Sequence, residues 1–291
     1  MNSLIINNLS KTYQNGVKAL DNLSLEISNG MFGLLGPNGA GKSSLMKTLA
    51  GLQKADQGEI LFNGQNISQN PQAVKQYLGF LPQDFGVYPK VSAYDLLYHI
   101  ATLKGIANGS ERREQVLALL QQVNLYAQRK NDVHTFSGGM RQRFGVAQAL
   151  LGDPRLLIVD EPTAGLDPEE RNRFNNLLSE IGEEKIIILS THLVEDVKNL
   201  CTQMAVMKSG KIIAQGKPDY FISLMKGQLW EKTISRLERP RYEQEFNVIS
   251  SHLNMAQLLI HVYAKHHPGE GFKAIDPGLE DVYFHLLHNK H

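Results

Sequence analysis

The sequence predicts an α/β fold with a parallel sheet at its centre and helices on both faces of that sheet. Two short, wholly apolar segments, 156–159 and 186–189, alternate with stretches whose apolar residues have helical spacing, a pattern typical of buried parallel strands. The first 28 residues instead show the period-two alternation of half-buried strands. A glycine-rich segment, 33–51, joins an apolar run to a helical pattern. Together these features indicate a mixed sheet.

The individual elements follow from the same patterns. The segments "SLIINNL" and "NLSLEIS" predict two strands, and "GEILFNGQ" predicts another that ends in an "NG" turn. Between residues 92 and 126 we expect two helices, the first capped by Ser92 and the second starting at Ser110. From residue 137 onward helices and strands alternate, and Pro168 lies in the first turn of one helix.

We expect two parts in the chain. Residues 1–216 form the α/β domain, with a helical subdomain at about 84–150. Residues 217–291 form a small, less regular C-terminal extension that ends in the helical pattern "GLEDVYFHLL". A regulatory contact, a dimer contact and structural support all fit this extension. Because no acids or cysteines stand at metal-ligand spacing from them, we interpret its tail histidines as solvated: His261, His266 and His267.

Composition restricts the binding partners and the cellular compartment expected for the protein. The formal net charge is +1, so no long-range field favours a nucleic acid or an anionic membrane. The single cysteine, Cys201, is interpreted as a small core residue and fits a reducing compartment. The N-terminal segment lacks the pattern of a secretory signal, and no aliphatic run approaches the ~20 residues of a membrane-spanning helix. We therefore expect a cytoplasmic protein.

The strongest motif is the segment "GPNGAGKS", which fits G-x-x-x-x-G-K-[ST]. It follows an apolar strand and opens a helix, as that motif requires. Without β-carbons the loop can turn its backbone N–H groups around a phosphate, and the helix N-terminus adds partial positive charge. Lys42 is expected to reach the outer phosphates, and the Ser43 hydroxyl to hold Mg²⁺. The predicted nucleotide-binding residues in this loop are Gly36, Pro37, Asn38, Gly39, Ala40, Gly41, Lys42, Ser43 and Ser44.

A second group of polar residues lies within the segment "LLIVDEP", residues 156–162. Its four apolar residues predict a buried strand, and Asp160 lies at the end of that strand, where ligands bind in open α/β sheets. Because Mg²⁺ prefers carboxylates, phosphate oxygens and retained waters, we predict that Asp160 holds this metal through water. Glu161 follows directly, and we predict that it polarises the attacking water as a general base.

Between these motifs lies "FSGGMRQR", residues 136–143, and together they resemble the nucleotide-binding domain of an ABC ATPase. Other positions of that family appear in its order, so that the resemblance covers about residues 4–215. It implies the fold of a P-loop NTPase with ATP and Mg²⁺ as ligands. The further residues it implies are Tyr13 for adenine stacking, Gln83 for the attacking water and Mg²⁺, Asp167 for the loop after the catalytic glutamate, and His192 for the γ-phosphate or the orientation of Glu161.

The segment "SGG" opens a helix and is itself predicted to bind an anion. The family commonly has glutamine where this chain has Met140 and leucine where it has Phe136, while Ser137, Gly138 and Gly139 are intact. The resemblance implies that two domains dock head to tail, each "SGG" closing over the ATP of the other. We therefore expect a homodimer or pseudo-dimer with two ATP molecules at its interface.

Two segments make the resemblance more specific: "FLPQDFGVYPKVSAYDLLYHIATLKG" and "GLEDVYFHLL". Both are similar to ATP-binding subunits of bacterial multidrug and ABC-2-type exporters, which implies a separate permease and a place on the inner face of the cell membrane. A short cytoplasmic helix of that permease would enter a cleft near residues 83–105. Candidates to line the cleft are Phe85, Tyr88, Tyr94 and Tyr98, although internal packing is at least as good an interpretation of Tyr94 and Tyr98.

Two other function classes explain fewer features. A soluble ABC ATPase that acts on nucleic acid or ribosomes usually carries an inserted coiled coil or two ATPase domains. Residues 44–136 hold no sustained heptads, and no second phosphate loop follows. A small-molecule kinase with the same loop would leave the "SGG" helix and His192 unexplained.

Overall fold

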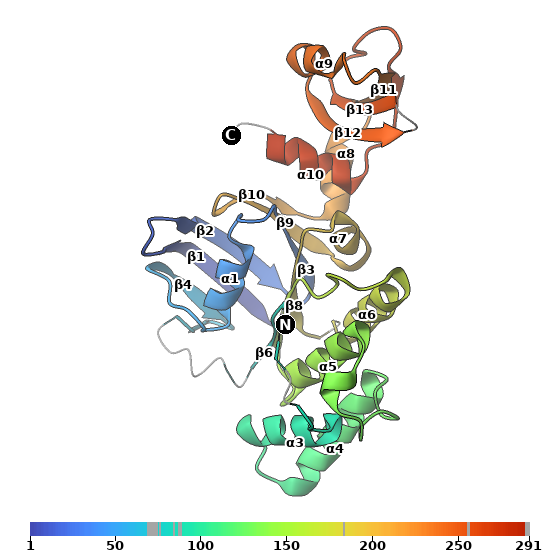
Figure 1. Cartoon of the computed structure of the whole chain (residues 1–291). Helices are drawn as coiled ribbons and strands as arrows, with labels where there is room; N and C mark the ends of the chain where they lie inside the picture. Colours follow the sequence, from blue (N-terminus) through green and yellow to red (C-terminus); the bar gives the residue numbers. More distant parts are fainter. Residues whose placement is uncertain are drawn as a thin grey trace.

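The computed structural model describes residues 1–68, 75, 77–83, 85, 86, 89–182, 184–254 and 257–288. In these residues three sheets are formed, two in the α/β domain and one in the C-terminal extension (Figure 1). Figure 1 shows the molecule as elongated, with the extension at one end and the helices α3 (Ala93–Leu103) and α4 (Gly109–Gln122) at the other. The first two sheets lie between these ends.

The central sheet has six strands in the order β10-β9-β3-β8-β7-β6. All neighbouring pairs are parallel except β10 with β9, so the predicted mixed sheet is confirmed. Every side chain of β7 and β8 is buried, which explains the apolar segments 156–159 and 186–189. The strands are β3 (Gly30–Leu35), β6 (Leu78–Leu81), β7 (Leu156–Asp160), β8 (Ile186–Thr191), β9 (Gln203–Lys208) and β10 (Lys211–Gly216).

A second, antiparallel sheet covers one face of the first, with helix α1 (Lys42–Leu49) packed in the same hydrophobic cluster. On its second strand, inward-facing Leu23, Leu25 and Ile27 alternate with exposed polar residues, as the period-two pattern predicts. In the order β2-β1-β4-β5, its strands are β2 (Lys18–Ser28), β1 (Ser3–Thr12), β4 (Gln57–Phe62) and β5 (Gln65–Asn66).

Side-chain caps set where several helices begin. Ser92 accepts a hydrogen bond from the Asp95 N–H (3.1 Å), which confirms the predicted cap of α3. The next helix begins one residue earlier than predicted, because Asn108 rather than Ser110 supplies its cap. The remaining helices of the α/β domain among the described residues are η1 (Val133–Thr135), α5 (Gly138–Leu150), α6 (Pro168–Ile181) and α7 (Val194–Leu200).

The C-terminal extension is more regular than predicted. It contains a four-stranded antiparallel sheet with its own small apolar core, and the expectation of an irregular segment is wrong there. On β13 the buried residues are Leu258, Ile260 and Val262. Their alternation is not visible in the sequence, because Leu259 and Tyr263 on the other face are apolar as well. Its elements are α8 (Pro218–Met225), β11 (Leu229–Ile234), α9 (Arg239–Glu245), β12 (Val248–Asn254), β13 (Gln257–Tyr263), β14 (Lys273–Ala274) and α10 (Leu279–His288).

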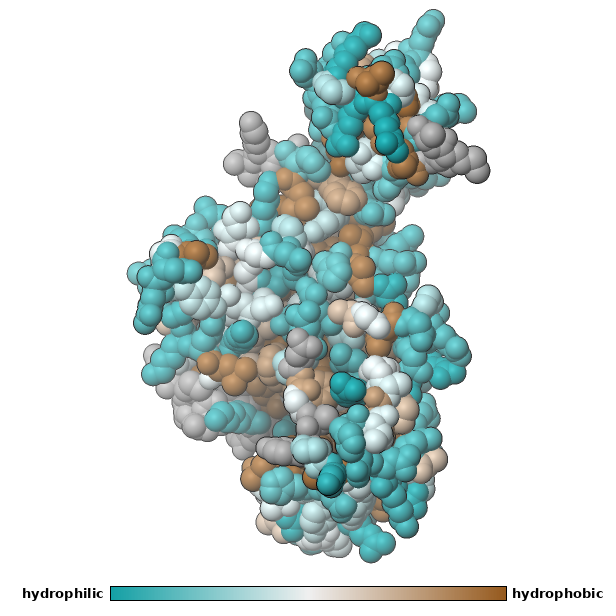
Figure 2. Space-filling view, viewed as in Figure 1, coloured by the Kyte–Doolittle hydropathy of each residue, from teal (hydrophilic) through white to brown (hydrophobic). Residues whose placement is uncertain are grey.

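Helices α8 and α10 join the extension to the α/β domain. Lys208 at the end of β9 donates a hydrogen bond to the Leu287 carbonyl of α10, and Val282 belongs to the core of the α/β domain. In Figure 2 hydrophobic side chains are visible over this junction, and Tyr220 and Leu224 on α8 are more than half exposed. Within the described ranges, no helix combines the length and the apolar character needed to cross a bilayer.

The interpretation of Cys201 as a core residue is confirmed. The residue lies between α7 and β9 and is 7% exposed. Burial, helped by the nearby Asp196 carboxylate, raises the pKa of the thiol to about 12. Since the thiolate is the reactive form, this thiol is inert in the folded protein.

We predict that Cys201 does not react with a thiol reagent at about pH 8 in the native protein and reacts fully once the chain is unfolded in urea. The measurement is the absorbance released by Ellman's reagent with and without denaturant. Fast stoichiometric reaction of the native protein would contradict the burial of this side chain.

Candidate nucleotide-binding site

Three adjacent parallel strands, β3, β8 and β7, end at the same edge of the central sheet. Leu35 at the end of β3 pairs with Thr191, and Asp160 at the end of β7 pairs with Ser190. The chain segments that follow these strands therefore emerge side by side, at the edge where α/β sheets bind their ligands.

The loop after β3 depends on glycine for steric reasons. Gly41, which caps α1, has φ +107°, in a region that L side chains rarely adopt. A β-carbon at this position would lie 2.2 Å from the Ala19 carbonyl oxygen, and one at Gly36 would lie 2.5 Å from the Met207 carbonyl oxygen. The loop is thus held directly against the backbones of β2 and β9.

The Lys42 ammonium lies inside this loop and is 5% exposed. Its Nζ donates hydrogen bonds to the carbonyl oxygens of Gly36 (2.7 Å) and Pro37 (3.4 Å). It also lies 3.6 Å from Glu161 Oε1. A buried charge is costly unless it is paired and hydrogen-bonded, and these oxygens meet both conditions.

Glu161 connects the ammonium to the loop after β8. Its Oε2 lies 3.1 Å from His192 Nδ1, so one carboxylate contacts Lys42 and His192 through its two oxygens. The backbone of Glu161 is left-handed, with φ +46°, and its N–H donates to the Ser190 carbonyl (2.9 Å). This conformation costs about 1 kcal/mol for a residue with a side chain, and strain of this kind clusters at functional sites. No motif in the sequence predicts this backbone conformation.

Asp160, which directly precedes Glu161, is 6% exposed. Its Oδ1 accepts a hydrogen bond from the Ser190 hydroxyl on the neighbouring strand. The carboxylate is therefore fixed at the end of β7.

A cavity of about 870 Å³ opens above the loop. Among the residues predicted from the sequence, it brings together Tyr13, the loop from Asn38 to Ser44, Gln83, Glu161 and His192. Asp160, Gly36 and Pro37 do not line it. It is also lined by residues that sequence reasoning missed, because no motif marks them: Val17, Lys18, Ala19, Ala164 and Ser209.

Tyr13 lies at the margin of the cavity and is 38% exposed. Its hydroxyl is hydrogen-bonded with Ser44 Oγ (2.9 Å) and donates to Gln53 Oε1 (3.1 Å). These contacts hold the aromatic side chain beside the first turn of α1.

The remaining predicted residues lie outside the cavity. Ser137 caps α5 by accepting a hydrogen bond from the Met140 N–H (3.2 Å), and Gly138 and Gly139 form the first turn of that helix. Asp167 caps α6 by accepting one from the Glu170 N–H (2.8 Å). The "SGG" helix and the Asp167 loop therefore do not contribute to the cavity of their own chain.

Comparison with known proteins identifies the family to which the chain belongs. A family model described as ABC transporter matches residues 20–164. The chain is 34% identical over 223 residues to the linearmycin resistance ATP-binding protein LnrL of Bacillus subtilis, covering 76% of this chain and 71% of that protein. It is 38% identical over 221 residues to the Nod factor export ATP-binding protein I of Cupriavidus metallidurans, covering 75% of this chain and 72% of that protein. The chain belongs to the ABC transporter ATP-binding proteins.

Solved structures agree with this assignment. A dimeric ATP-binding cassette bound to ADP and phosphate in a post-hydrolysis state superposes with a TM-score of 0.66 at 26% identity, covering 74% of this chain and 98% of that chain. CbiO1 from Clostridium perfringens, part of an ABC transporter complex, gives 0.69 at 29% identity, covering 76% and 90%. The predicted P-loop NTPase fold is confirmed, and the protein is an ATPase.

A buried carboxylate of this ABC ATPase, Asp196, was not identified from the sequence. It is 2% exposed and accepts hydrogen bonds from Thr163 Oγ1 (2.8 Å) and Asn175 Nδ2 (3.3 Å). Arg171 Nε lies 3.4 Å from it. Asp196 thus ties the segment after Glu161 to α6 and α7. Its partners lie 21 to 33 residues away, a separation that leaves no local pattern.

A second missed contact joins α5, the "SGG" helix, to α6. Arg143 Nη1 donates to Glu170 Oε2 (2.5 Å), and both side chains are largely buried. A β-carbon at Gly139 would lie 2.0 Å from the same carboxylate oxygen. Glycine at this position of the "SGG" segment therefore lets the Glu170 carboxylate approach the first turn of α5.

The interpretation of the tail histidines is wrong for His261. Its Nδ1 lies 2.7 Å from Asp281 Oδ1, and its side chain is 16% exposed. Burial acts to raise the pKa of Asp281, but the hydrogen bonds from His261 and the Gly278 N–H together hold this pKa below its usual value. His266 is exposed, as predicted, while the exposed His267 ring packs edge-on against Trp230 (4.8 Å between centroids).

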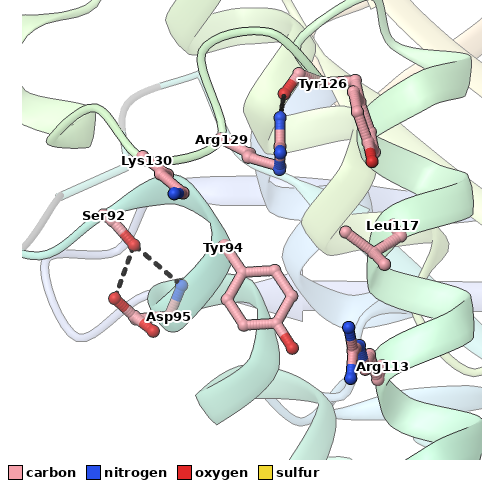
Figure 3. A pocket seen from close by; sticks show the side chains of 8 residues that line it. All are labelled: Ser92, Tyr94, Asp95, Arg113, Leu117, Tyr126, Arg129 and Lys130. Carbon is pink, nitrogen blue, oxygen red and sulfur yellow. Dashed lines mark hydrogen bonds between the residues drawn. The ribbon is translucent and has the colours of Figure 1, made fainter.

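The aromatic candidates near residues 83–105 separate into different environments. Phe85 packs over Gly145 of α5, where a β-carbon would meet its ring at 2.8 Å. Tyr94 stacks on Tyr98, with ring centroids 5.9 Å apart, and Tyr94 also lines a surface pocket (Figure 3). Tyr88 lies outside the described residues.

We predict different effects of alanine at two glycines of the phosphate loop. Gly41→Ala should lower the free energy of unfolding by about 3 kcal/mol or more, because it combines a left-handed backbone with overlap on the Ala19 carbonyl. Gly39→Ala should cost only about 1 kcal/mol, since Gly39 is left-handed (φ +79°) but has no atom within 4 Å of the added carbon.

The measurement is urea denaturation of both variants beside the wild type. Equal destabilisation by the two substitutions would contradict the packing of the loop against β2.

Proposed function

We propose that this ABC ATPase subunit hydrolyses ATP in the cavity above the Gly36–Ser44 loop and thereby drives export through a separate membrane permease. The observation that carries the proposal is the position of the Glu161 carboxylate. It lies at the margin of a glycine-loop cavity, between the buried Lys42 ammonium and His192.

The residue roles follow from the chemistry of phosphoryl transfer. Lys42 exchanges its bonds to the loop carbonyls for the outer phosphate oxygens and compensates their charge, together with the loop N–H groups and the N-terminus of α1. Glu161 accepts the proton of the attacking water as the new O–P bond forms at the γ-phosphorus and the bond from that phosphorus to the bridging oxygen of ADP breaks, so that ADP leaves with the electron pair. His192 holds the second oxygen of that carboxylate and orients it, and it would also hydrogen-bond the γ-phosphate. We propose Tyr13, at the cavity margin, as the adenine-stacking residue.

The oxygen donors at this edge of the sheet fit a magnesium ion. Ser43 and Gln83 both line the cavity and supply a hydroxyl and an amide oxygen, while the buried Asp160 carboxylate ends β7 and accepts a hydrogen bond from Ser190. Mg²⁺ prefers such hard oxygen ligands and retains waters, so Asp160 would act through a water. Bound there, the ion would neutralise charge on the phosphates. Gln83 would also contact the attacking water.

We propose that a second copy of the chain, or a related ATPase domain, completes the site. Ser137, Gly138, Gly139 and Asp167 lie away from the cavity of their own chain, although N–H groups at the start of α5 are suited to a phosphate. The solved cassette described above is dimeric, which supports the association of two such domains, and we propose that they dock head to tail. Loss of phosphate after hydrolysis removes the charge that both chains bind, and the dimer opens.

The export assignment and the membrane partner rest on relatives. The Nod factor export ATP-binding protein I has been described above, and the lipopolysaccharide export system ATP-binding protein LptB of Haemophilus influenzae is 31% identical over 223 residues, covering 75% of this chain and 92% of that protein. We therefore place the chain on the inner face of the cell membrane, bound to a permease. The helical subdomain at about 84–150 is the proposed contact with that permease.

We assign residues 1–216 to the ATPase domain and residues 217–291 to the extension. The separate apolar core of the extension supports this division. Helix α10 packs on α7, the helix that follows His192, and we propose that the extension stabilises or regulates this part of the site through that contact.

We predict that Glu161→Gln retains ATP binding and loses hydrolysis by about 100-fold or more, because the amide cannot take the proton of the attacking water. The variant should accumulate as an ATP-bound dimer. Phosphate release measures the rate, and light scattering with ATP and Mg²⁺ measures the dimer.

Glu26→Gln is the matched control, since Glu26 is exposed on β2 and outside the cavity. Its turnover should equal that of the wild type. Normal turnover by Glu161→Gln would remove Glu161 from the role of general base.

A further inference from the structure

The buried carboxylate of Asp196 lies between the two segments that carry Glu161 and His192. Asp196 belongs to the first turn of α7, the helix that begins at Val194, just after His192, and it is 2% exposed. Its Oδ2 accepts a hydrogen bond from the Oγ1 of Thr163 (2.8 Å), which follows Glu161 closely in the chain. One carboxylate therefore joins both segments without lining the nucleotide cavity itself.

The other oxygen of this carboxylate faces α6. Asp196 Oδ1 accepts a hydrogen bond from Asn175 Nδ2 (3.3 Å) and lies 3.4 Å from Arg171 Nε. The hydrogen bonds and the positive charge of Arg171 compensate the buried negative charge. Because α6 packs on both α5 and α7, Asp196 is anchored to a helix that the rest of the domain holds in place.

The segment after Glu161 needs such an anchor. The left-handed backbone of Glu161 (φ +46°) persists only where surrounding contacts hold it. Its carbonyl accepts a hydrogen bond from the Ala164 N–H (3.3 Å), and the Thr163 carbonyl accepts one from the Leu166 N–H (3.2 Å). These bonds lie within the turn itself, whereas the Thr163 hydroxyl ties the turn to Asp196 on another element.

The first turn of α7 also depends on Asp196. The cap position is held by Leu193, whose apolar side chain cannot accept a hydrogen bond from the helix. The Asp196 N–H donates to the Leu193 carbonyl (3.2 Å), and its side chain links this turn to Thr163. The position of His192, directly before Leu193, is thereby set relative to the segment that carries Glu161.

Stability alone is a poor reason for a buried charge at this position. Burial of a charged group costs desolvation energy, and apolar residues of similar size are often equally or more stabilising. Hydrogen bonds to a carboxylate add direction, because each donor must lie in a defined place. The two segments that these bonds fix have a distance to keep, since Glu161 Oε2 and His192 Nδ1 are 3.1 Å apart.

We propose that Asp196 is a positioning residue for ATP hydrolysis, which keeps the Glu161 carboxylate and His192 in contact through Thr163 and the first turn of α7. The inference rests on the proposed function, in which Glu161 is the general base, and adds the residue that orients this base from outside the cavity. Small displacements of a reacting group lower the rate strongly. The phosphate loop is held against β2 and β9, so nucleotide binding should not depend on Asp196.

The first test separates rate from affinity. Asp196→Asn replaces one of the two accepting oxygens with an N–H₂ group, so it should lower kcat about tenfold while the KM for ATP changes less than about twofold. Thr163→Val removes the hydroxyl and should have the same effect. Thr163→Ser keeps the hydroxyl and should retain most of the wild-type kcat. Phosphate release by the full chain is measured over a range of Mg-ATP concentrations.

The second test is a double-mutant cycle with His192. Because His192→Ala removes the group that Asp196 positions, Asp196→Asn should lower kcat less than about twofold in that background. The slow rates are followed with radiolabelled ATP. A tenfold loss in both backgrounds would show that Asp196 does not act through the contact of Glu161 with His192, and would overturn the inference.

The matched control is Val197→Ala, which loosens the same helix without removing a hydrogen bond. Val197 is buried, and it packs so closely on β3 that a β-carbon at Gly33 would lie 2.7 Å from its side chain. Its urea midpoint should fall, but its kcat should stay near that of the wild type. In all variants Cys201, just after α7, should stay unreactive toward Ellman's reagent while the helix remains packed. If Asp196→Asn does not fold, Thr163→Val and Thr163→Ser decide by the same criterion.

The outcomes separate this inference from the proposed function. If Glu161→Gln hydrolyses ATP as the wild type does, the proposed function fails and this inference fails with it. If Glu161→Gln is inactive, but Asp196→Asn and Thr163→Val keep the wild-type kcat, only the role of Asp196 is overturned. A raised KM with unchanged kcat would also overturn it, as would an equal loss of kcat in Val197→Ala at a similar urea midpoint.

Discussion

The buried ammonium of Lys42 is the interaction on which the site depends. It lies inside a loop whose glycines are pressed against neighbouring strands, and it is surrounded by the Gly36 and Pro37 carbonyls and the Glu161 carboxylate. In a poorly solvated position these oxygens must compensate a full charge. In the proposed function phosphate oxygens replace these oxygens, so that the arrangement which stabilises the loop also binds the nucleotide.

The other parts of the site hold the partners of this ammonium in place. Glu161 has a strained backbone, and the adjoining Ser190 fixes both its N–H and the Asp160 carboxylate. The buried Asp196 then links the segment after Glu161 to α6 and α7. Helix α7 also contacts the extension through α10. The candidate site therefore lies in the middle of the molecule, between the helical subdomain at one end and the C-terminal sheet at the other (Figure 1).

Local patterns in the sequence predict several parts of the structure correctly. Wholly apolar strands, the cap at Ser92 and the glycine loop each depend on neighbouring residues, and each was predicted. The sheet of the extension was missed because apolar side chains on both of its faces hide the alternation. The pairs Arg143–Glu170 and Thr163–Asp196 were missed because their members meet only after the sheet has brought distant segments together.

Calorimetric titration with Mg-ATP tests the central claim most directly. The wild-type chain should bind with a measurable heat, and Lys42→Ala should lose that heat while remaining folded by circular dichroism. Lys47→Ala, an exposed lysine on the same helix, should bind as the wild type does. Unchanged affinity in folded Lys42→Ala, or no heat with the wild type, would contradict the claim that this ammonium and its glycine loop hold the nucleotide.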